Sequence, residues 1–194
     1  MAGKKSADRS GSVRIIGGRW RGRRIPVPPQ ADVRPTADRV RETLFNWLMP
    51  VIEGSRCLDL FAGTGALGLE ALSRGAAGTW FVDTDVKAMA ELERVVERFK
   101  SEGECGEVTV MTSDAFGFLK RSPVPFDIVF LDPPFEGIEL ENLCTLLEQG
   151  WLRPGAYIYL ELSKRDGLPV LPRGWEITRE KTAGQVRFAL AKRS

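Results

Sequence analysis

Short apolar runs alternate with segments of helical periodicity over most of the chain. The apolar runs cover residues 56–61, 79–82, 107–111, 126–131 and 156–162. Between them, apolar residues recur every three or four positions, which predicts helices over 66–73, 85–100, a short stretch from 114, and 138–149. Apolar strands that alternate with helices are typical of a parallel sheet covered on both faces. The pattern therefore predicts an α/β fold with a mostly parallel sheet.

The two ends of the chain depart from this alternation. Residues 13–16 and 20–27 predict a β-hairpin around Gly17-Gly18, and residues 175–180 and 185–191 predict an antiparallel terminal hairpin. Thr36 is the expected cap of a helix that Pro50 ends. We therefore divide the chain into a disordered basic tail (1–11), a basic hairpin with its linker (12–34) and an α/β domain (35–194).

Charge is distributed unevenly along the 194 residues. The chain has 28 Lys and Arg against 26 Asp and Glu, a net charge of +2. Residues 1–41 hold eleven basic and three acidic residues, which is +8 and leaves −6 for the rest. A basic segment on an acidic body is typical of a protein that binds a polyanion. A solvated tail is the alternative, but Ile15, Trp20 and Ile25 interleave with the arginines and favour a folded surface.

Composition excludes several classes of protein. The chain has no histidine, which rules out Ser-His-Asp hydrolysis and His-ligated zinc, and we expect no metal site. No apolar run approaches 18 residues, so no membrane span is expected, and the polar N-terminus does not resemble a secretory signal. The cysteines, Cys57, Cys105 and Cys144, are odd in number and far apart. We expect reduced thiols that pack in a cytoplasmic protein.

A glycine-rich turn follows the apolar run 56–61. The sequence DLFAGTGALG covers residues 59–68 and places Gly63, Gly65 and Gly68 in the pattern G-x-G-x-x-G. Glycines permit a sharp strand-to-helix turn and close approach of a ligand, although a tight turn without a ligand has the same pattern. Asp59 favours a cationic group, such as the amino group of a methionine moiety, over the pyrophosphate of a dinucleotide.

Two further acids follow the next two predicted strands. Ligands of open α/β sheets bind beyond the carboxyl ends of the strands, where these acids are expected to lie. Asp83 could accept hydrogen bonds from both ribose hydroxyls of a nucleoside. Asp114 could accept the exocyclic amine of an adenine, or could cap the helix that begins there, and the sequence favours neither role.

The tetrapeptide Asp132-Pro133-Pro134-Phe135 follows the apolar strand 126–131. Two prolines end a central strand, hold the backbone rigid and remove two N–H donors. The carbonyls and the Asp132 carboxylate then form a group of hydrogen-bond acceptors, and Phe135 supplies a flat face for stacking. Acceptors beside an aromatic face suit a nucleobase that carries an exocyclic NH2 group. An ordinary Pro-Pro turn is the less favoured alternative.

Together these features resemble a class I S-adenosylmethionine-dependent methyltransferase that acts on an exocyclic amine. Longer segments resemble the bacterial 16S rRNA guanine-N2 methyltransferase family, RsmD. They are RIIGGRWRGR at 14–23, RPT at 34–36, DRVRETLFNWL at 38–48, GALGLEALSR at 65–74 and the closing segment 180–185. The resemblance covers about residues 11–190. One departure is Asp83, where the family often has Glu, and either side chain can hold a ribose.

The resemblance implies a Rossmann-like, seven-stranded class I methyltransferase sheet, mostly parallel with an antiparallel terminal hairpin. The small N-terminal hairpin is an extension of it. The resemblance also implies S-adenosyl-L-methionine as cofactor and, as substrate, N2 of guanine 966 in 16S rRNA of an assembled or nearly assembled 30S subunit. We expect a monomer with no membrane partner. Candidate catalytic residues are Asp132, Pro133, Pro134 and Phe135. Candidate cofactor residues are Thr36, Asp59, Phe61, Gly63, Gly65, Asp83, Thr84, Asp114, Ala115 and Asp132. Candidate RNA-binding residues are Arg14, Arg19, Arg21, Arg23, Arg24, Arg34 and Arg39.

The expected chemistry is direct methyl transfer, in which the protein orients the amine. Asp132 and the Pro133 carbonyl would accept the N2–H groups, and Phe135 would stack on the base, so that no histidine is needed. Two other classes remain open. One is an amine methyltransferase that acts on DNA adenine or another RNA, and the other is a non-enzymatic RNA-binding factor. A nicotinamide oxidoreductase would leave the basic hairpin and the Pro-Pro turn without a role.

Overall fold

The computed structural model describes residues 11–27, 37–101, 103, 105–134 and 139–194. Five helices lie in these ranges: α1 (Ala37–Leu48), α2 (Ala66–Ser73), α3 (Val86–Lys100), α4 (Ala115–Leu119) and α5 (Leu140–Leu147). The described strands are β1 (Ser12–Arg14), β2 (Arg24–Pro26), β3 (Arg56–Asp59), β4 (Gly78–Asp83), β5 (Glu107–Thr112), β6 (Phe126–Leu131), β7 (Leu152–Ser163), β8 (Trp175–Ala183) and β9 (Val186–Arg193). Within the described ranges, no helix is both long and apolar enough to cross a membrane.

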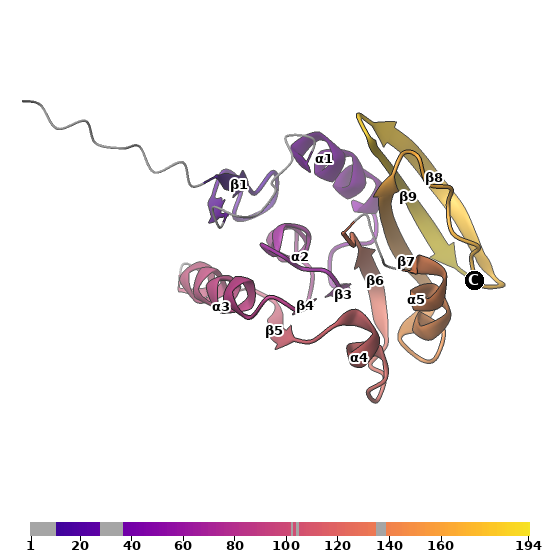
Figure 1. Cartoon of the computed structure of the whole chain (residues 1–194). Helices are drawn as coiled ribbons and strands as arrows, with labels where there is room; N and C mark the ends of the chain where they lie inside the picture. The colour runs from indigo at the N-terminus through magenta and orange to yellow at the C-terminus, as the bar shows by residue number, and fades with distance from the viewer. Residues whose placement is uncertain (1–10, 28–36, 102, 104, 135–138) are drawn as a thin grey trace, which may run out of the picture.

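Seven of the strands form one sheet in the order β5-β4-β3-β6-β7-β9-β8. Strands β3 to β7 are parallel to one another, and β9 lies antiparallel between β7 and β8 (Figure 1). The strand order reverses between β3 and β6, and ligands of α/β sheets bind at such a reversal. The predicted fold class, with a mostly parallel sheet and an antiparallel terminal hairpin, is confirmed.

Neighbouring residues of the central strands face two different helix layers. Cys57 in β3 and Ile128 in β6 pack with residues of α1 and α2, whereas Leu58 and Val129 pack with residues of α4 and α5. Helix α3 lies beside α2 on the first face (Figure 1). The central strands are therefore covered on both sides, which explains why their sequences are apolar without alternation.

Most predicted boundaries agree with the structure to within a few residues. Helix α2 and strand β6 begin and end where the pattern places them, whereas β7 begins at Leu152 rather than at residue 156. Asp85 caps α3, because its carboxylate accepts the amides of Lys87 and Ala88 at 2.8 and 3.1 Å. The expected cap of α1, Thr36, lies outside the described residues.

The N-terminal hairpin differs from the prediction in its second strand. Strand β2 begins at Arg24 rather than Trp20, and residues 17–23 form a wide turn with positive φ at Gly18 and Gly22. The reason is that the Trp20 side chain is buried against Phe99 of α3, with ring centroids 4.8 Å apart. The chain must therefore turn inward at Trp20 before it can pair as β2.

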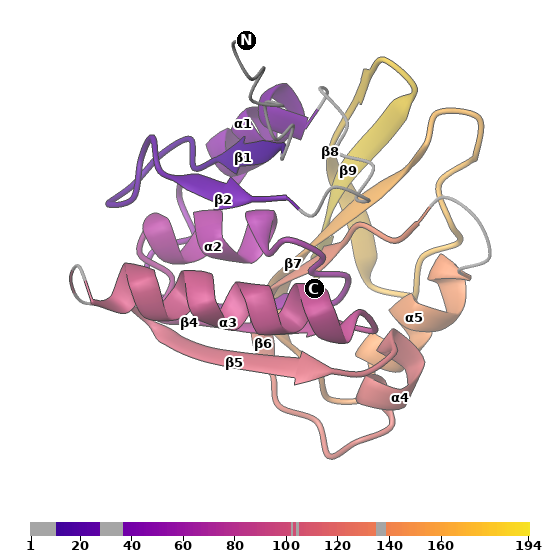
Figure 2. The same ribbon diagram turned by 60° about the vertical axis from the view of Figure 1, so that its left-hand side comes forward.

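The hairpin also shares its apolar core with the α/β body. Its buried side chains are Val13, Ile15, Trp20, Ile25 and Val27, and they pack with residues of α2 and α3. Figure 2 shows the hairpin lying along α2. The division of the chain at residue 34 stays a prediction. The hairpin and the two helices nevertheless share one apolar cluster.

Helix α2 approaches β4 closely at Gly68. A Cβ atom at this position would lie 2.2 Å from Cε1 of Phe81 and 2.8 Å from Cγ2 of Thr79, and both residues are fully buried. We expect Gly68→Ala to lower the free energy of unfolding by about 2 kcal/mol, because overpacking outweighs the gain in helix propensity. Denaturant titration measures this change. Gly167→Ala, which meets no atom within 4 Å, should change it by less than about 0.5 kcal/mol, and an equal loss in both variants would contradict the argument.

Candidate active site at the strand ends

The carboxyl ends of β3, β4, β5 and β6 lie along one edge of the sheet, because these strands are parallel neighbours. Each strand ends in, or is closely followed by, one of the predicted acids: Asp59, Asp83, Asp114 and Asp132. The fold therefore brings together four carboxylates that are up to 73 positions apart in the sequence. This edge is where the sequence predicts cofactor and substrate to bind.

Asp59 is the most deeply buried of these acids, with 2% of its surface exposed. Its carboxylate accepts the Gly68 amide of α2 at 3.0 Å. The pKa of Asp59 is raised to about 7, chiefly by burial and to a smaller extent by the charge of Asp83, while hydrogen bonds from the Gly68 and Phe61 amides lower it. Phe61 is partly buried against the core on the α4 side. Asp59 thus supplies a carboxylate whose charge a nearby cation would strongly favour.

The turn between β3 and α2 has open space beside Gly63. Gly63 has φ +50°, and a Cβ atom there would meet no atom within 4 Å. Gly65, by contrast, is packed so closely that a Cβ atom would lie 2.5 Å from Cδ1 of Leu92. Gly63 therefore leaves room for a ligand against bare backbone, as a cofactor site requires, while Gly65 sets the path of the chain.

Asp83 braces this glycine turn. One carboxylate oxygen accepts the Gly63 amide at 2.8 Å and the other accepts the Asp85 amide at 2.9 Å. The sequence predicted contacts with ribose hydroxyls and did not foresee either bond. A carboxylate oxygen can accept a second hydrogen bond, so the ribose role stays a prediction. Thr84, the adjacent cofactor candidate, is exposed.

Asp114 caps α4, which was one of its two open roles. Its carboxylate accepts the Gly117 amide at 2.8 Å while the residue remains exposed. Ala115, also a cofactor candidate, is buried at the start of α4. Asp114 therefore caps α4, and its contact with an adenine stays a prediction.

Asp132 follows β6 directly and is partly buried. Pro133 is buried and Pro134 is exposed, and Phe135 lies outside the described residues. The β6–β7 register pairs Leu131 with Leu160, so the next step places Asp132 beside Glu161 of β7. The described part of the tetrapeptide therefore stands at the strand end as predicted.

A buried tyrosine is hydrogen-bonded to Glu161 and lies within electrostatic reach of Asp132, and sequence reasoning missed it. Tyr159 is fully buried and donates its hydroxyl to Glu161 at 2.5 Å. The pKa of Tyr159 lies well above its usual value because of burial, with smaller contributions from the charges of Glu161 and Asp132. The signal that could have found this pair is the sequence YIYLE, in which polar groups interrupt an apolar strand near its carboxyl end.

The hairpin presents arginines toward solvent. Arg14, Arg19, Arg21, Arg24 and Arg39 are exposed, whereas Arg34 lies outside the described residues. Arg23 is partly buried, with its guanidinium 5.4 Å from the ring centroid of Phe99. A groove of about 520 Å³ lies between the hairpin and α1, lined by Arg14, Arg21 and Arg39 together with Asp38 and Glu42. Basic side chains thus gather around one groove although they come from separate segments.

Comparison with known proteins identifies the family. The chain matches the model of the family described as Conserved hypothetical protein 95 over residues 13–192. It is 50% identical over 185 residues to Ribosomal RNA small subunit methyltransferase D of Escherichia coli strain K12, a match that covers 95% of this chain and 91% of that protein. The chain belongs to the ribosomal RNA small subunit methyltransferase D family.

Solved structures agree with this membership. Putative methyltransferase yhhF from Escherichia coli matches with a TM-score of 0.86 and 48% identity, covering 94% of this chain and 98% of that one. A Thermus thermophilus 16S rRNA N2 G1207 methyltransferase in complex with AdoMet and guanosine matches with a TM-score of 0.67 and 22% identity. That match covers 96% of this chain and 50% of the Thermus chain, and at this identity it supports the fold alone. The predicted family, enzyme class and cofactor are confirmed: the chain is an S-adenosylmethionine-dependent methyltransferase of this family.

The raised pKa of Asp59 predicts a pH-dependent stability. Between the unfolded pKa of about 4 and the folded pKa of about 7, the folded state binds more protons than the unfolded state, so this group lowers stability as pH rises through that window. Asp59→Asn keeps an acceptor for Gly68 and removes the charge. Relative to the unmodified protein, its free energy of unfolding should rise by roughly 2–3 kcal/mol between pH 5 and pH 8.

Denaturant titrations at several pH values measure this difference. Asp166→Asn, at an exposed position, is the matched control. Its free energy of unfolding should differ from that of the unmodified protein by the same amount at every pH. A difference between Asp59→Asn and the unmodified protein that stays constant with pH would contradict the assignment.

Proposed function

We propose that this enzyme transfers a methyl group to the exocyclic N2 of guanine 966 in 16S rRNA, within an assembled or nearly assembled 30S subunit. The observation that carries the proposal is the acceptor group at the end of β6, where Asp132 and buried Pro133 follow the strand with no N–H on the proline. An amine with two N–H donors is the ligand that such a group suits. The names of the chain's relatives support rRNA as the molecule that contains this amine.

In the proposed mechanism, the protein orients the amine. The Asp132 carboxylate and the Pro133 carbonyl accept the two N2–H groups and direct the nitrogen lone pair toward the methyl group. Bound S-adenosylmethionine supplies an electrophilic methyl group on a sulfonium sulfur. Asp132 stabilises the positive charge that develops on N2 and accepts the proton that leaves, directly or through water. Phe135 is proposed to stack on the base.

The glycine turn and its acids are proposed to hold the cofactor. Gly63 leaves open space against the backbone, and Asp59 ends β3 at the start of the same turn. Asp59 suits the amino group of the methionine moiety, and Asp83 suits the ribose. Phe61, Gly65, Thr84, Asp114 and Ala115 complete the proposed site along the same edge, with Asp132 at its boundary and Thr36 contributed by the segment before α1.

The groove between the hairpin and α1 is proposed to bind phosphates of the RNA. Arg14, Arg21 and Arg39 line it together, and exposed Arg19 and Arg24 extend the basic surface along the hairpin. Arg23 and Arg34 remain candidates. Arginine contacts to phosphates position a nucleic acid without reading its sequence. The hairpin therefore supplies general affinity, while the strand-end pocket selects the base. We propose that the enzyme acts as a monomer.

Asp132→Ala tests the catalytic role. Loss of the acceptor should reduce methyl transfer to 30S subunits by at least about 10²-fold, because positioned electrostatic groups contribute at that scale. Binding of S-adenosylmethionine, measured by calorimetry, should survive. Glu176→Ala, an exposed change on β8, is the control and should keep full activity. Near-normal turnover of Asp132→Ala would overturn this role, and transfer to plasmid DNA in preference to subunits would overturn the substrate.

The triple variant Arg14→Gln, Arg21→Gln, Arg39→Gln tests RNA binding. Deleting residues 1–30 is less informative, because it removes buried Ile15, Trp20 and Ile25 from the core. The triple variant should bind 30S subunits at least about tenfold more weakly, with a slope of log affinity against log salt that is shallower by about 2. A matched triple at exposed Arg165, Arg173 and Arg179 is the control. An equal loss in both triples would assign the effect to net charge alone.

A further inference from the structure

We infer that Glu70 is a positioning residue that fixes the arginine hairpin relative to the methyl-transfer site. The inference rests on the proposed function, because it assumes that the hairpin binds RNA. Glu70 lies on α2, and neither the proposed mechanism nor the proposed cofactor site uses it. Its hydrogen bonds nevertheless join α2 to the hairpin.

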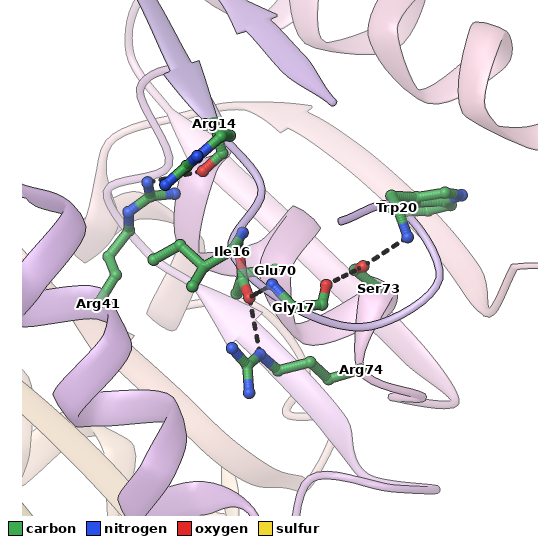
Figure 3. Close-up of polar contacts among 8 residues, drawn as sticks. All are labelled: Arg14, Ile16, Gly17, Trp20, Arg41, Glu70, Ser73 and Arg74. Carbon is green, nitrogen blue, oxygen red and sulfur yellow. Dashed lines mark hydrogen bonds and ion pairs between the residues drawn. The ribbon is translucent and has the colours of Figure 1, made fainter. Parts of the chain in front are cut away.

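The carboxylate of Glu70 is fully buried and faces the hairpin backbone. One oxygen accepts the Ile16 amide at 2.7 Å, and the other accepts the Gly17 amide at 2.8 Å (Figure 3). The Nε–H of Arg74, the residue that follows α2 at its C-terminal cap, donates to the second oxygen at 2.7 Å. A buried carboxylate is costly unless it is neutralised and hydrogen-bonded, and here one arginine and two amides do both.

Ser73 makes a second contact of the same kind. Its hydroxyl accepts the Trp20 amide at 2.9 Å and donates to the Gly17 carbonyl at 2.6 Å. The Ser73 carbonyl accepts the Arg19 amide at 2.8 Å. Two residues of α2 therefore bind the hairpin backbone at Ile16, Gly17, Arg19 and Trp20. We call Glu70 and Ser73 the α2 latch.

The glycines of the hairpin show how closely it is held. A Cβ atom at Gly17 would lie 2.5 Å from Nη2 of Arg74. A Cβ atom at Gly18, where φ is +73°, would lie 1.9 Å from the Ser73 carbonyl oxygen. The hairpin backbone thus touches the end of α2, so the Gly-Gly pair serves contact with a helix as well as a turn.

The latch connects the RNA-binding surface to the cofactor turn through one helix. Helix α2 begins at the glycine turn, where Gly68 is bonded to Asp59, and its last turn carries the latch. The candidate arginines stand close to the latched backbone, since Arg14 lies two residues before Ile16, and Arg19 and Arg21 flank Trp20. The position of the latch therefore sets how far bound phosphates lie from the site of methyl transfer.

Glu70→Gln tests this role with little change in shape. The amide group can accept one hairpin N–H but meets the other with a donor, and Arg74 loses its counter-charge. We expect KM for 30S subunits to rise about tenfold, the effect of losing one charge-assisted hydrogen bond. The salt dependence of KM should become shallower, because fewer arginines reach phosphates together. The rate at saturating subunits and the calorimetric affinity for S-adenosylmethionine should stay within about twofold.

Further variants separate positioning from stability. Gly18→Ala displaces the same backbone by steric conflict without a charge change, and Ser73→Ala removes two latch bonds with little loss of volume. Both should raise KM and flatten its salt dependence as Glu70→Gln does. Glu176→Gln makes the same chemical change at an exposed position on β8 and should match the unmodified enzyme. The substrate is 30S subunits from a strain that lacks this methyltransferase activity.

The outcomes are distinguishable. Latch variants that lose cofactor affinity and saturating rate in proportion, with KM and salt dependence unchanged, would show a structural role alone and overturn the inference. Latch variants that match the unmodified enzyme throughout would also overturn it, while the proposed function stands. An unmodified enzyme that leaves 30S subunits unmethylated would overturn the proposed function and the inference with it.

Discussion

The hydrogen bond from the Gly68 amide to the buried Asp59 carboxylate ties the end of β3 to the start of α2, and much of the molecule depends on it. It can form only because Gly68 lets α2 lie against Phe81 of β4 without a side chain between them. Once α2 is held there, the glycine turn has one path, and Asp83 braces it through Gly63. The far end of the same helix then meets the hairpin. One short helix thus joins the edge proposed to bind the cofactor to the surface proposed to bind RNA.

Electrostatics divides the molecule along this helix. At its start, Asp59 and Asp83 concentrate negative charge, and the pKa of Asp59 rises because burial disfavours that charge. The cofactor proposed to bind at this edge carries a sulfonium and an amino group, so it would place positive charge beside these acids. At its end, Arg74 is paired with Glu70, and Arg14, Arg19, Arg21 and Arg24 of the hairpin are exposed. The small net charge of the chain conceals this separation.

The sequence predicts what depends on local pattern and misses what depends on packing between distant segments. Strand β6 and helix α2 were predicted to the residue because their composition is decisive. The second hairpin strand was placed four residues early, because burial of Trp20 against Phe99 is a contact that no local pattern reveals. Glu70 was not singled out, since a glutamate in a short helix is normally solvated. Its burial becomes evident only when residues 16 and 17 are placed beside it, 53 or more positions away in the sequence.

An apolar contact could hold the hairpin on α2 with less cost than a buried carboxylate. Replacement of buried ion pairs by apolar side chains is often neutral or stabilising, so stability alone does not explain Glu70. Apolar packing by Ile15 and Trp20 defines the register of the hairpin less sharply than a hydrogen bond does, because such contacts lack direction. The two amides bonded by Glu70 have one geometry that satisfies both. If the enzyme presents one amine to one methyl group as proposed, it gains from that fixed geometry, because a displacement of about 1 Å can lower a rate by orders of magnitude.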